Sequence, residues 1–247
     1  MKVWNQHTEM NDGLLGFPGD TVIGGAHDWT LWQLESGDVW YAPRSGWYLV
    51  TGSGGGGAGS GYTSNGNTTT GGGSGGGLIN APVWIPQGVG GVVSIGAGGA
   101  STSANGENTT FGVDLMIFAG GTGGTINGGY PAHGSVSGRL LTRNNKIVYS
   151  ASGSPGYYET VGSGVGYMGG ANGGMGVLAD NAFSIANGIL TGRFSKGGHY
   201  PTWSTSGNPG EAFGAGGSAG TNGTGGNGAA GCLFIAWTGI LTPGNII

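Results

Sequence analysis

Charged side chains are scarce in this sequence of 247 residues. Only 7% of the residues are charged, 7 Lys and Arg against 11 Asp and Glu, and the formal net charge is −4. Nucleic-acid binding requires Lys and Arg gathered into a basic patch, so we do not expect a nucleic-acid partner. A membrane-spanning helix needs roughly 18 or more apolar residues in a row. The sequence contains no such run, so we do not expect membrane insertion either.

Cysteine is almost absent. Cys232 is the single cysteine, which excludes a disulfide within the chain. It lies in the apolar run GCLFIAW, where a buried, inert thiol is expected. Residues 1–20 lack the basic and then apolar pattern of a secretory signal. We therefore expect the chain to mature in the cytoplasm without export.

Catalytic and metal-binding patterns are isolated rather than clustered. Several GxGxxG matches occur, such as Gly52-x-Gly54-x-x-Gly57 and Gly164-x-Gly166-x-x-Gly169, and GxSxG occurs around Ser74 and Ser218. Neither type of match sits at the strand-to-helix turn that its chemistry requires. A glycosidase would need two convergent carboxylates, and the carboxylates of the glycine-rich body lie far apart in sequence. We therefore expect a protein that is not an enzyme, with no cofactor and no metal site. The isolated histidines and body carboxylates are His7, His27, His133, His199, Glu107, Asp114, Glu159, Asp180 and Glu211.

Glycine, in contrast, is abundant, with 64 residues gathered mainly into clumps. Glycine adds no side chain to a core and loses the most conformational freedom when it is ordered. Such a chain is either disordered or packed so that backbones approach more closely than a Cβ allows. Disordered chains combine high net charge with few aromatic residues. This chain has little charge and 10% aromatic residues, which favours an ordered structure whose cost is offset by oligomerisation.

Short apolar runs between the glycine clumps predict an all-β fold. They are aromatic or β-branched and are bounded by Gly, Pro or Asn, as strands are. No segment keeps a helical period over three turns. The expected strands are 46–51, 82–86, 92–95, 113–118, 139–150 with a turn at Asn144-Asn145, and 232–238. We predict a β-sandwich-like body with long glycine-rich loops, assembled as an oligomer.

One glycine clump has a period of three residues. Gly214, Gly217, Gly220, Gly223 and Gly226 are evenly spaced. This is the period of an extended left-handed helix of the polyproline type, which makes no internal hydrogen bonds. Its N–H and C=O groups must therefore bond to neighbouring segments or to water. Packing of the polyglycine-II type is one interpretation, and a flexible linker is the other.

Composition changes near position 45. Residues 1–44 hold eight of the charged side chains, and none occurs between Ser45 and Gly106. We interpret residues 1–45 as an attachment or docking segment, and residues 46–247 as a glycine-rich β domain. The candidate attachment residues are Trp4, Trp29, Trp32 and Trp40.

Aromatic residues also occur within the glycine tracts. Loops carry recognition more often than strands do, and Tyr and Trp are preferred anchors at interfaces. For any one of them, packing inside the protein is an equally good interpretation. The candidate receptor-contact residues are Tyr62, Tyr130, Tyr157, Tyr158, Tyr167, Tyr200 and Trp203.

The order of these pieces resembles the glycine-rich domain of bacteriophage tail fibres and receptor-binding proteins. The resemblance covers much of 46–238. It rests on the alternation and order of strand-like and glycine-rich segments rather than on a catalytic motif. The segments that carry it are GWYLVTGSGGGGAGSG (46–61), VWIPQGVGGVVSIGAGG (83–99), NGENTTFGVDLMIFAGGTGG (105–124) and GAGGSAGTNGTGGNGAAGCLFIAWT (214–238).

The resemblance implies a β-rich body, homotrimeric or otherwise assembled, at the tip of a fibre in the virion. Such domains contact lipopolysaccharide or an outer-membrane protein of the host. The chain departs from a long fibre because it has no extended repeat ahead of the body. The resemblance therefore implies a separate tip or accessory protein that docks to other virion tail proteins through residues 1–45. A purely structural virion protein, such as a tail connector or capsid decoration, is the alternative. A secreted ice-binding or cell-wall protein and a depolymerase are more distant ones.

Overall fold

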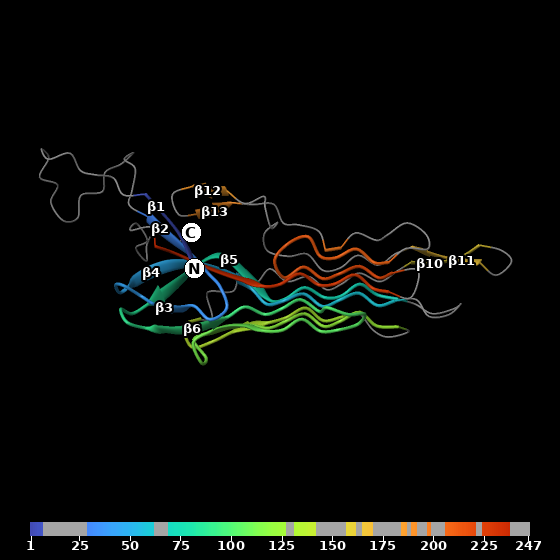
Figure 1. Cartoon of the computed structure of the whole chain (residues 1–247), viewed down its shortest axis with the longest axis horizontal. Helices are drawn as coiled ribbons and strands as arrows, with labels where there is room; N and C mark the ends of the chain where they lie inside the picture. The colour runs from blue at the N-terminus through green and yellow to red at the C-terminus, as the bar shows by residue number, and fades with distance from the viewer. Residues whose placement is uncertain are drawn as a thin grey trace, which may run out of the picture.

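The chain folds into two antiparallel β-sheets from which glycine-rich segments extend in one direction (Figure 1). The computed structural model describes residues 1–6, 29–61, 69–126, 131–141, 157–161, 165–169, 184–186, 189–191, 197–198, 206–220 and 224–237. No helix occurs within these ranges, so the prediction of an all-β protein is confirmed. The predicted turn at Asn144-Asn145 lies outside the described residues. Residues 139–141, the described start of the predicted strand 139–150, do not form a strand.

Five strands form the first sheet, in the order β1-β2-β14-β4-β5. The C-terminal strand β14 lies between β2 and β4, so the two ends of the chain meet in one sheet. The predicted strands at 46–51 and 232–238 correspond to β4 and β14. The bounds are β1 (Lys2–Gln6), β2 (Trp29–Leu34), β14 (Cys232–Trp237), β4 (Gly46–Ser53) and β5 (Gly77–Ile85).

The second sheet has the order β3-β6-β7-β8-β9 and shorter strands. The predicted strand at 92–95 corresponds to β6. The predicted strand at 113–118 is shorter, because Gly112 has a left-handed φ of 60° and a turn precedes β8. The bounds are β3 (Val39–Tyr41), β6 (Gly90–Ser94), β7 (Thr109–Phe111), β8 (Met116–Phe118) and β9 (Val136–Ser137).

Two hairpins stand outside these sheets. One consists of β10 (Tyr157–Val161) and β11 (Val165–Gly169), and the other of β12 (Ser184–Ala186) and β13 (Ile189–Thr191). Figure 1 places β10 and β11 far from the sheets and β12 and β13 beside them.

The two sheets share one hydrophobic core. Tyr48 and Ile235 of the first sheet pack in one cluster with Phe111 and Phe118 of the second. The core is rich in aromatic side chains, which bury large apolar areas. Trp40 lies at its centre, with its ring centroid 5.4 Å from Trp32, 5.7 Å from Tyr48 and 5.8 Å from Phe111.

A second, smaller cluster covers the other face of β14. Phe234 and Cys232 lie there with Leu190 of β13, and Cys232 is buried as predicted. Asn80, whose φ of 45° is left-handed, holds β13 in place. Its side-chain amide donates to the carbonyl oxygen of Leu190 (2.7 Å) and accepts from the Leu190 N–H (3.2 Å). Strand β14 is therefore buried on both faces, which explains its continuous apolar run.

Segments 29–34 and 39–41 belong to the two sheets rather than to a separate unit. Strand β2 pairs with β14, and β3 pairs with β6. Trp40 of β3 is only 4% exposed. The change of composition near position 45 therefore does not coincide with a boundary between separately packed parts of the described fold.

The glycine-rich segments form four excursions away from the sheets. Residues 54–76 join β4 to β5, 95–108 join β6 to β7, 119–135 join β8 to β9, and 214–231 lead into β14. In Figure 1 these segments lie side by side along the long axis of the molecule. We call their parallel array the glycine bundle.

Residues 54–60 occupy the centre of the glycine bundle, and all of them are buried. Every N–H group from Gly54 to Ser60 donates to a carbonyl of another segment, at 2.8–3.1 Å. Successive residues donate to different segments, and every third residue donates to the same segment again. Residues 54, 57 and 60 donate to Gly76, Gly73 and Thr70; residues 55 and 58 to Glu107 and Ala104; residues 56 and 59 to Ala229 and Gly226.

The carbonyl groups of the same segment follow the same period. Those of residues 55–60 accept at 2.7–2.9 Å from Gly121, Gly99, Gly217, Gly124, Ser103 and Gly220 in turn. The central segment thus donates to three segments that return toward the sheets and accepts from three that leave them. Six neighbours at backbone distance leave no room for side chains of ordinary size.

Gly57 shows why glycine is needed in this row. A Cβ at Gly57 would overlap the carbonyl oxygen and carbon of Thr122, and both are backbone atoms that cannot turn aside. We expect Gly57→Ala to lower the free energy of unfolding by at least about 3 kcal/mol, the upper range for overpacking. Denaturant unfolding monitored by circular dichroism measures this.

Gly46→Ala is the matched control. A Cβ at Gly46 would have the Trp237 indole nitrogen as its nearest neighbour, at 3.8 Å, an ordinary contact. We expect this variant to unfold like the wild type. Equal stability of Gly57→Ala and Gly46→Ala would contradict close packing around residue 57.

Tyr48 makes the stability of the sheets sensitive to alkali. Its hydroxyl donates to the carbonyl oxygen of Arg44 (2.7 Å), and burial raises the pKa of the Tyr48 phenol above its ordinary value. The fold therefore favours the protonated phenol. This stability is present below the unfolded-state pKa and is lost as the pH rises through the folded-state pKa.

We expect Tyr48→Phe to be less stable by about 1 kcal/mol at neutral pH, because one hydrogen bond is lost. It should lose less stability than the wild type between neutral pH and pH of about 11, because its ring cannot ionise. Urea unfolding at both pH values measures this, with the exposed Tyr41→Phe as control. An identical alkaline loss in Tyr48→Phe and wild type would be contrary to this account.

Candidate functional site

The described parts of the four excursions reach the same end of the glycine bundle, which we call the loop end. Hydrogen bonds place Ser60, Ser103, Thr125 and Gly220 at one level there: Ser103 and Gly220 donate to the carbonyls of Gly59 and Ser60, and Thr70 links Ser60 to Thr125. Gly61 and Gly220 form a further bridge, as do Thr69 and Ile126. The sheets lie at the opposite end, which we call the sheet end (Figure 1).

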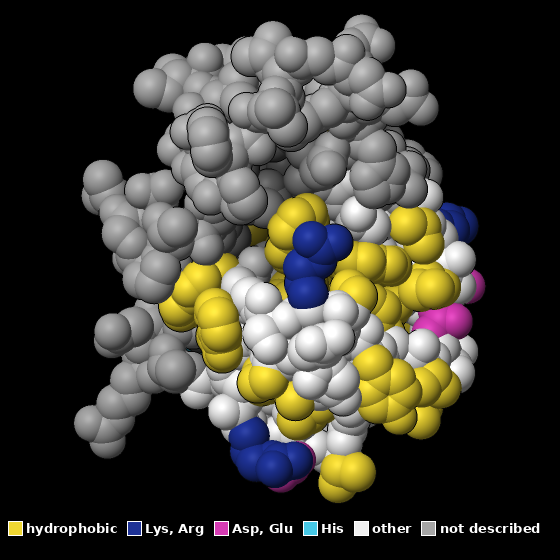
Figure 2. Space-filling model, turned by 90° about the vertical axis from the view of Figure 1, so that its left-hand side faces the viewer, with side chains coloured by type: hydrophobic (Ala, Val, Ile, Leu, Met, Phe, Trp, Pro, Cys, Tyr) yellow, Lys and Arg dark blue, Asp and Glu magenta, His cyan; other side chains and the backbone are white. Residues whose placement is uncertain are grey.

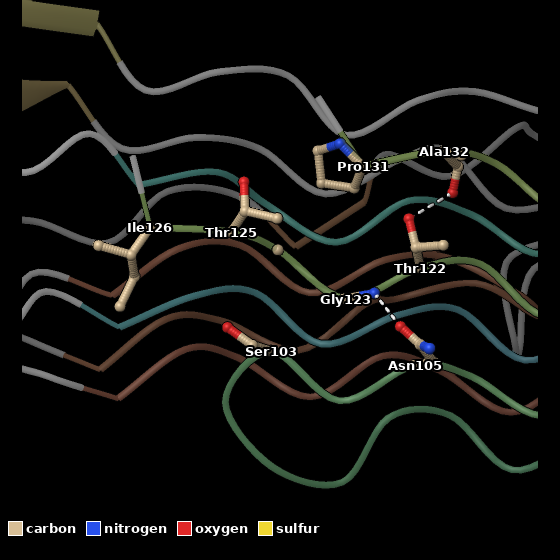
Figure 3. Close-up of a pocket in the computed structure, with 9 residues that line it drawn as sticks. Ser103, Asn105, Thr122, Gly123, Thr125, Ile126, Pro131 and Ala132 are labelled. Carbon is tan, nitrogen blue, oxygen red and sulfur yellow. Dashed lines mark hydrogen bonds between the residues drawn. The ribbon is translucent and has the colours of Figure 1, made fainter. Parts of the chain in front are cut away.

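A shallow groove of about 710 Å³ lies on the glycine bundle near the loop end. Figure 3 shows residues 122–126 between residues 131–132 of the same excursion and the 103–105 turn. The groove carries hydroxyl, amide and aliphatic side chains and no charged one. Its lining residues are Ser103, Asn105, Thr122, Gly123, Gly124, Thr125, Ile126, Pro131 and Ala132.

Hydrogen bonds hold both walls of the groove. The Thr122 hydroxyl donates to the carbonyl oxygen of Ala132 (2.9 Å), and the Gly123 N–H donates to Asn105 Oδ1 (2.8 Å) (Figure 3). The Thr125 N–H donates to Thr70 Oγ1 (2.7 Å). The side chains of Thr122 and Asn105 are therefore held in place before any ligand binds.

Asn105 belongs to a pair of asparagines with the same structural role. Asn108, three residues later, accepts from the Gly120 N–H at 3.0 Å, as Asn105 accepts from Gly123. Each side chain thus receives a backbone donor at the rim of the glycine bundle. Asn108 does not line the groove.

Ser103 has an unusual backbone conformation. Its φ of 62° is left-handed, which costs a residue other than glycine on the order of 1 kcal/mol or more. Ser103 and Asn80 are the two such residues in the described part of the chain. The two hydrogen bonds of the Asn80 side chain to Leu190 account for the left-handed φ of Asn80. Ser103 instead lies at the groove, and its N–H donates to the Gly59 carbonyl.

The described ion pairs lie away from the groove. The Met1 amino group is 2.9 Å from Asp38, and Arg139 pairs with Asp114. The hydrogen bond to Asp38 raises the pKa of the Met1 amino group. The pKa of Asp38 is lowered, mainly by the hydrogen bond from the Glu35 N–H and secondly by the one from the Met1 amino group. None of these residues lines the groove.

The structure brings three of the predicted receptor-contact residues onto one hairpin. Tyr157 and Tyr158 of β10 pair with Gly169 and Met168 of β11, and Tyr167 pairs with Glu159. Figure 1 shows this hairpin beyond the loop end. Tyr62, Tyr130, Tyr200 and Trp203 lie outside the described residues. In the sequence, Tyr62 follows Gly61 directly and Tyr130 precedes the groove residue Pro131.

The predicted attachment tryptophans have different positions. Trp32 is partly buried against the core and Trp29 against the smaller cluster, while Trp40 is a core residue with almost no surface for a partner. The backbone of Trp4 belongs to β1, and its side chain is outside the described set.

The sheet end carries an exposed aromatic and aliphatic surface that the sequence analysis did not identify. Trp84 is 48% exposed and meets Trp47 edge to face at 5.7 Å, and the Arg44 guanidinium lies 3.9 Å from the ring centroid of Trp237. Figure 2 views this end and shows hydrophobic side chains between a few charged ones. On the second sheet Val39 pairs with Val92, and both are exposed, as is Tyr41.

The described residues contain neither a cluster of metal ligands nor a helix that could span a membrane. In the described part of the chain, no three His, Cys, Asp or Glu side chains gather where they could hold a metal ion. None of the described segments is a helix long and apolar enough to cross a bilayer. A scan against protein-family models gives no match, and a search of curated proteins gives none either.

The two asparagine caps predict unequal effects of truncation. Gly123 is buried, whereas Gly120 is partly exposed. Water can therefore replace the Asn108 oxygen at the Gly120 N–H more easily than the Asn105 oxygen at the Gly123 N–H. We expect Asn105→Ala to cost about 1–3 kcal/mol, the penalty for a buried donor left without a partner. Asn108→Ala should cost less. Thermal and denaturant unfolding measure both, and equal or reversed costs would argue against these roles.

Proposed function

We propose that this chain is a bacteriophage virion protein, a tail-fibre tip or receptor-binding protein that recognises a molecule on the host cell surface. The receptor class is lipopolysaccharide or an outer-membrane protein. The proposal rests mainly on one observation: the described parts of the four glycine-rich excursions reach one common end of the glycine bundle, opposite the sheets. A rigid support that presents several turns together suits recognition.

The composition of the loop end supports this role. The sequence places Tyr62 and Tyr130 in the connections of two excursions, and Tyr157, Tyr158 and Tyr167 belong to the hairpin beyond them. Tyrosine binds partners through a rigid aromatic ring and a polar hydroxyl. The absence of charge over 45–106 leaves shape, hydroxyl groups and aromatic rings to provide specificity.

The finer architecture belongs to the same proposal. We take the glycine bundle to be a polyglycine-II-type array, supported by the three-residue period of its hydrogen bonds. We take the two sheets to be a β-sandwich-like body that assembles as a homotrimer. The exposed side chains of Val39, Tyr41, Trp84 and Val92 support the sheet end as the face that meets other virion proteins.

The same exposed surface favours the second candidate, a structural virion protein without a receptor role. In that case the sheet end is buried among tail or capsid proteins and the loop end has no ligand. The two candidates differ in whether the isolated protein binds cells.

We expect the purified, labelled protein to bind cells of the host bacterium and to block phage adsorption. Replacing Tyr62 and Tyr130 together by alanine should reduce cell binding at least about tenfold, the effect of losing one interface anchor. Tyr41→Ala, at the sheet end, is the control and should bind cells normally. Flow cytometry and adsorption assays measure these effects.

Two results together would reject the receptor-binding role. One is that the wild-type protein binds no cell envelope of a permissive host. The other is that virions lacking the protein adsorb normally. Cryo-electron microscopy that places the protein inside the tail would then favour the structural role.

A further inference from the structure

We infer that the groove at the loop end binds an uncharged saccharide, with Asn105 and Ser103 as its hydrogen-bonding residues. The inference rests on the proposed function and names the ligand class of one part of that recognition end. It is carried by the lining of the groove, by its fixed hydrogen bonds and by the backbone of Ser103.

The groove offers both donors and acceptors at fixed positions. Asn105 Oδ1 is bonded to the Gly123 N–H, which fixes the amide and turns its Nδ2 group to other partners. The Thr122 hydroxyl donates to Ala132, so its oxygen keeps acceptor capacity. The Ser103 hydroxyl can do both. A sugar presents hydroxyl and ring oxygens that can donate to and accept from these groups.

Aliphatic surface lies beside these polar groups. Ile126 is 37% exposed, and Ala132 is also exposed, at the opposite wall from Ser103 and Asn105 (Figure 3). A pyranose ring has polar edges and C–H faces, so it can contact both kinds of surface at once. A volume of about 710 Å³ is within the range of small-ligand sites, roughly 300–1,000 Å³.

The lining determines which saccharides fit. None of the nine lining residues carries a charge. A phosphate or carboxylate on the ligand would lose water in this groove without meeting a cation, which is unfavourable. An uncharged sugar has no such cost. Neutral hexoses and N-acetylhexosamines therefore fit better than phosphorylated or uronic acid residues.

The groove is also organised before binding. Ser103 is fixed by its N–H bond to the Gly59 carbonyl, and the next residue, Ala104, accepts from Ala58. Both bonds come from the buried central segment. Fixed polar groups reduce the ordering cost of binding, which matters for ligands that gain little from burial. The left-handed φ of Ser103 is the kind of local strain that persists at binding sites.

The test uses the full chain and an immobilised panel of neutral hexose and N-acetylhexosamine oligosaccharides. The same sugars bearing phosphate or uronic acid are the comparison. We expect binding to neutral sugars, and calorimetry then gives the affinities of three variants.

Asn105→Asp keeps the oxygen that accepts from Gly123 but replaces the two N–H donors by a charged oxygen. We expect it to fold normally and to bind at least about tenfold more weakly, as for one lost hydrogen bond of about 1.4 kcal/mol. Asn108→Asp makes the same chemical change three residues away, outside the groove. It should bind like the wild type.

Ser103→Gly separates binding from folding. Glycine adopts a left-handed φ without strain, so the melting temperature should stay the same or rise. The loss of the hydroxyl should weaken saccharide binding by about fivefold to tenfold. A residue that serves only the fold would not give higher stability with weaker binding.

Several outcomes would overturn the inference. These are binding to host cells without binding to any neutral sugar, preference for phosphorylated or acidic sugars, and equal affinity of Asn105→Asp, Ser103→Gly and wild type. If the wild-type protein still binds cells in these cases, only the saccharide inference fails and the receptor-binding role stands. Failure to bind both cells and sugars would remove both proposals.

Discussion

The main-chain hydrogen bonds of residues 54–60 are the constraint on which the rest of the structure depends. Each N–H group in this buried segment donates to a returning segment, and each carbonyl from Gly55 to Ser60 accepts from a departing one. Six neighbours can approach to this distance only where side chains are absent or as small as those of Ala58 and Ser60. The protein therefore has two interiors: an ordinary core of side chains between the sheets, and a core of backbone in the glycine bundle. The second interior leaves few buried polar groups without partners, which compensates for the side-chain burial that glycine cannot supply.

The sheets and the rim make this second interior possible. Strands β4 to β9 fix both ends of three excursions, so their directions and registers are set before they enter the glycine bundle. At the rim, where a neighbouring segment is missing, side chains accept the remaining N–H groups. Asn105 and Asn108 do so for Gly123 and Gly120. The groove arises at such a place, between the turn at Ser103 and the 119–135 excursion.

Part of this organisation could be predicted from the sequence. Short β-branched and aromatic runs predicted the all-β fold, and the apolar run around Cys232 predicted a buried strand, because both signals are local. The hydrogen bonds of Gly217 and Gly220 have the same three-residue period as the glycines of 214–226. The partners of these glycines could not be predicted, since most of them lie in residues 57–60 and 72–75, far away in the sequence. Trp40 was misleading for a related reason. A tryptophan in a charged segment resembles a surface anchor, and only the pairing of β3 with β6 places it in the core. The groove combines residues from three parts of the chain, so no local motif marks it.

Amide hydrogen exchange of residues 54–60 tests the central claim most directly. In native protein at neutral pH, the amides from Gly55 to Ser60 should exchange only through global unfolding, with the same protection as the amides of β4 and β14. Backbone-resolved exchange by nuclear magnetic resonance can compare them residue by residue. Exchange of these six amides at the rate of an unstructured peptide, while β4 and β14 remain protected, would show that the glycine-rich segments are flexible loops and would contradict the account.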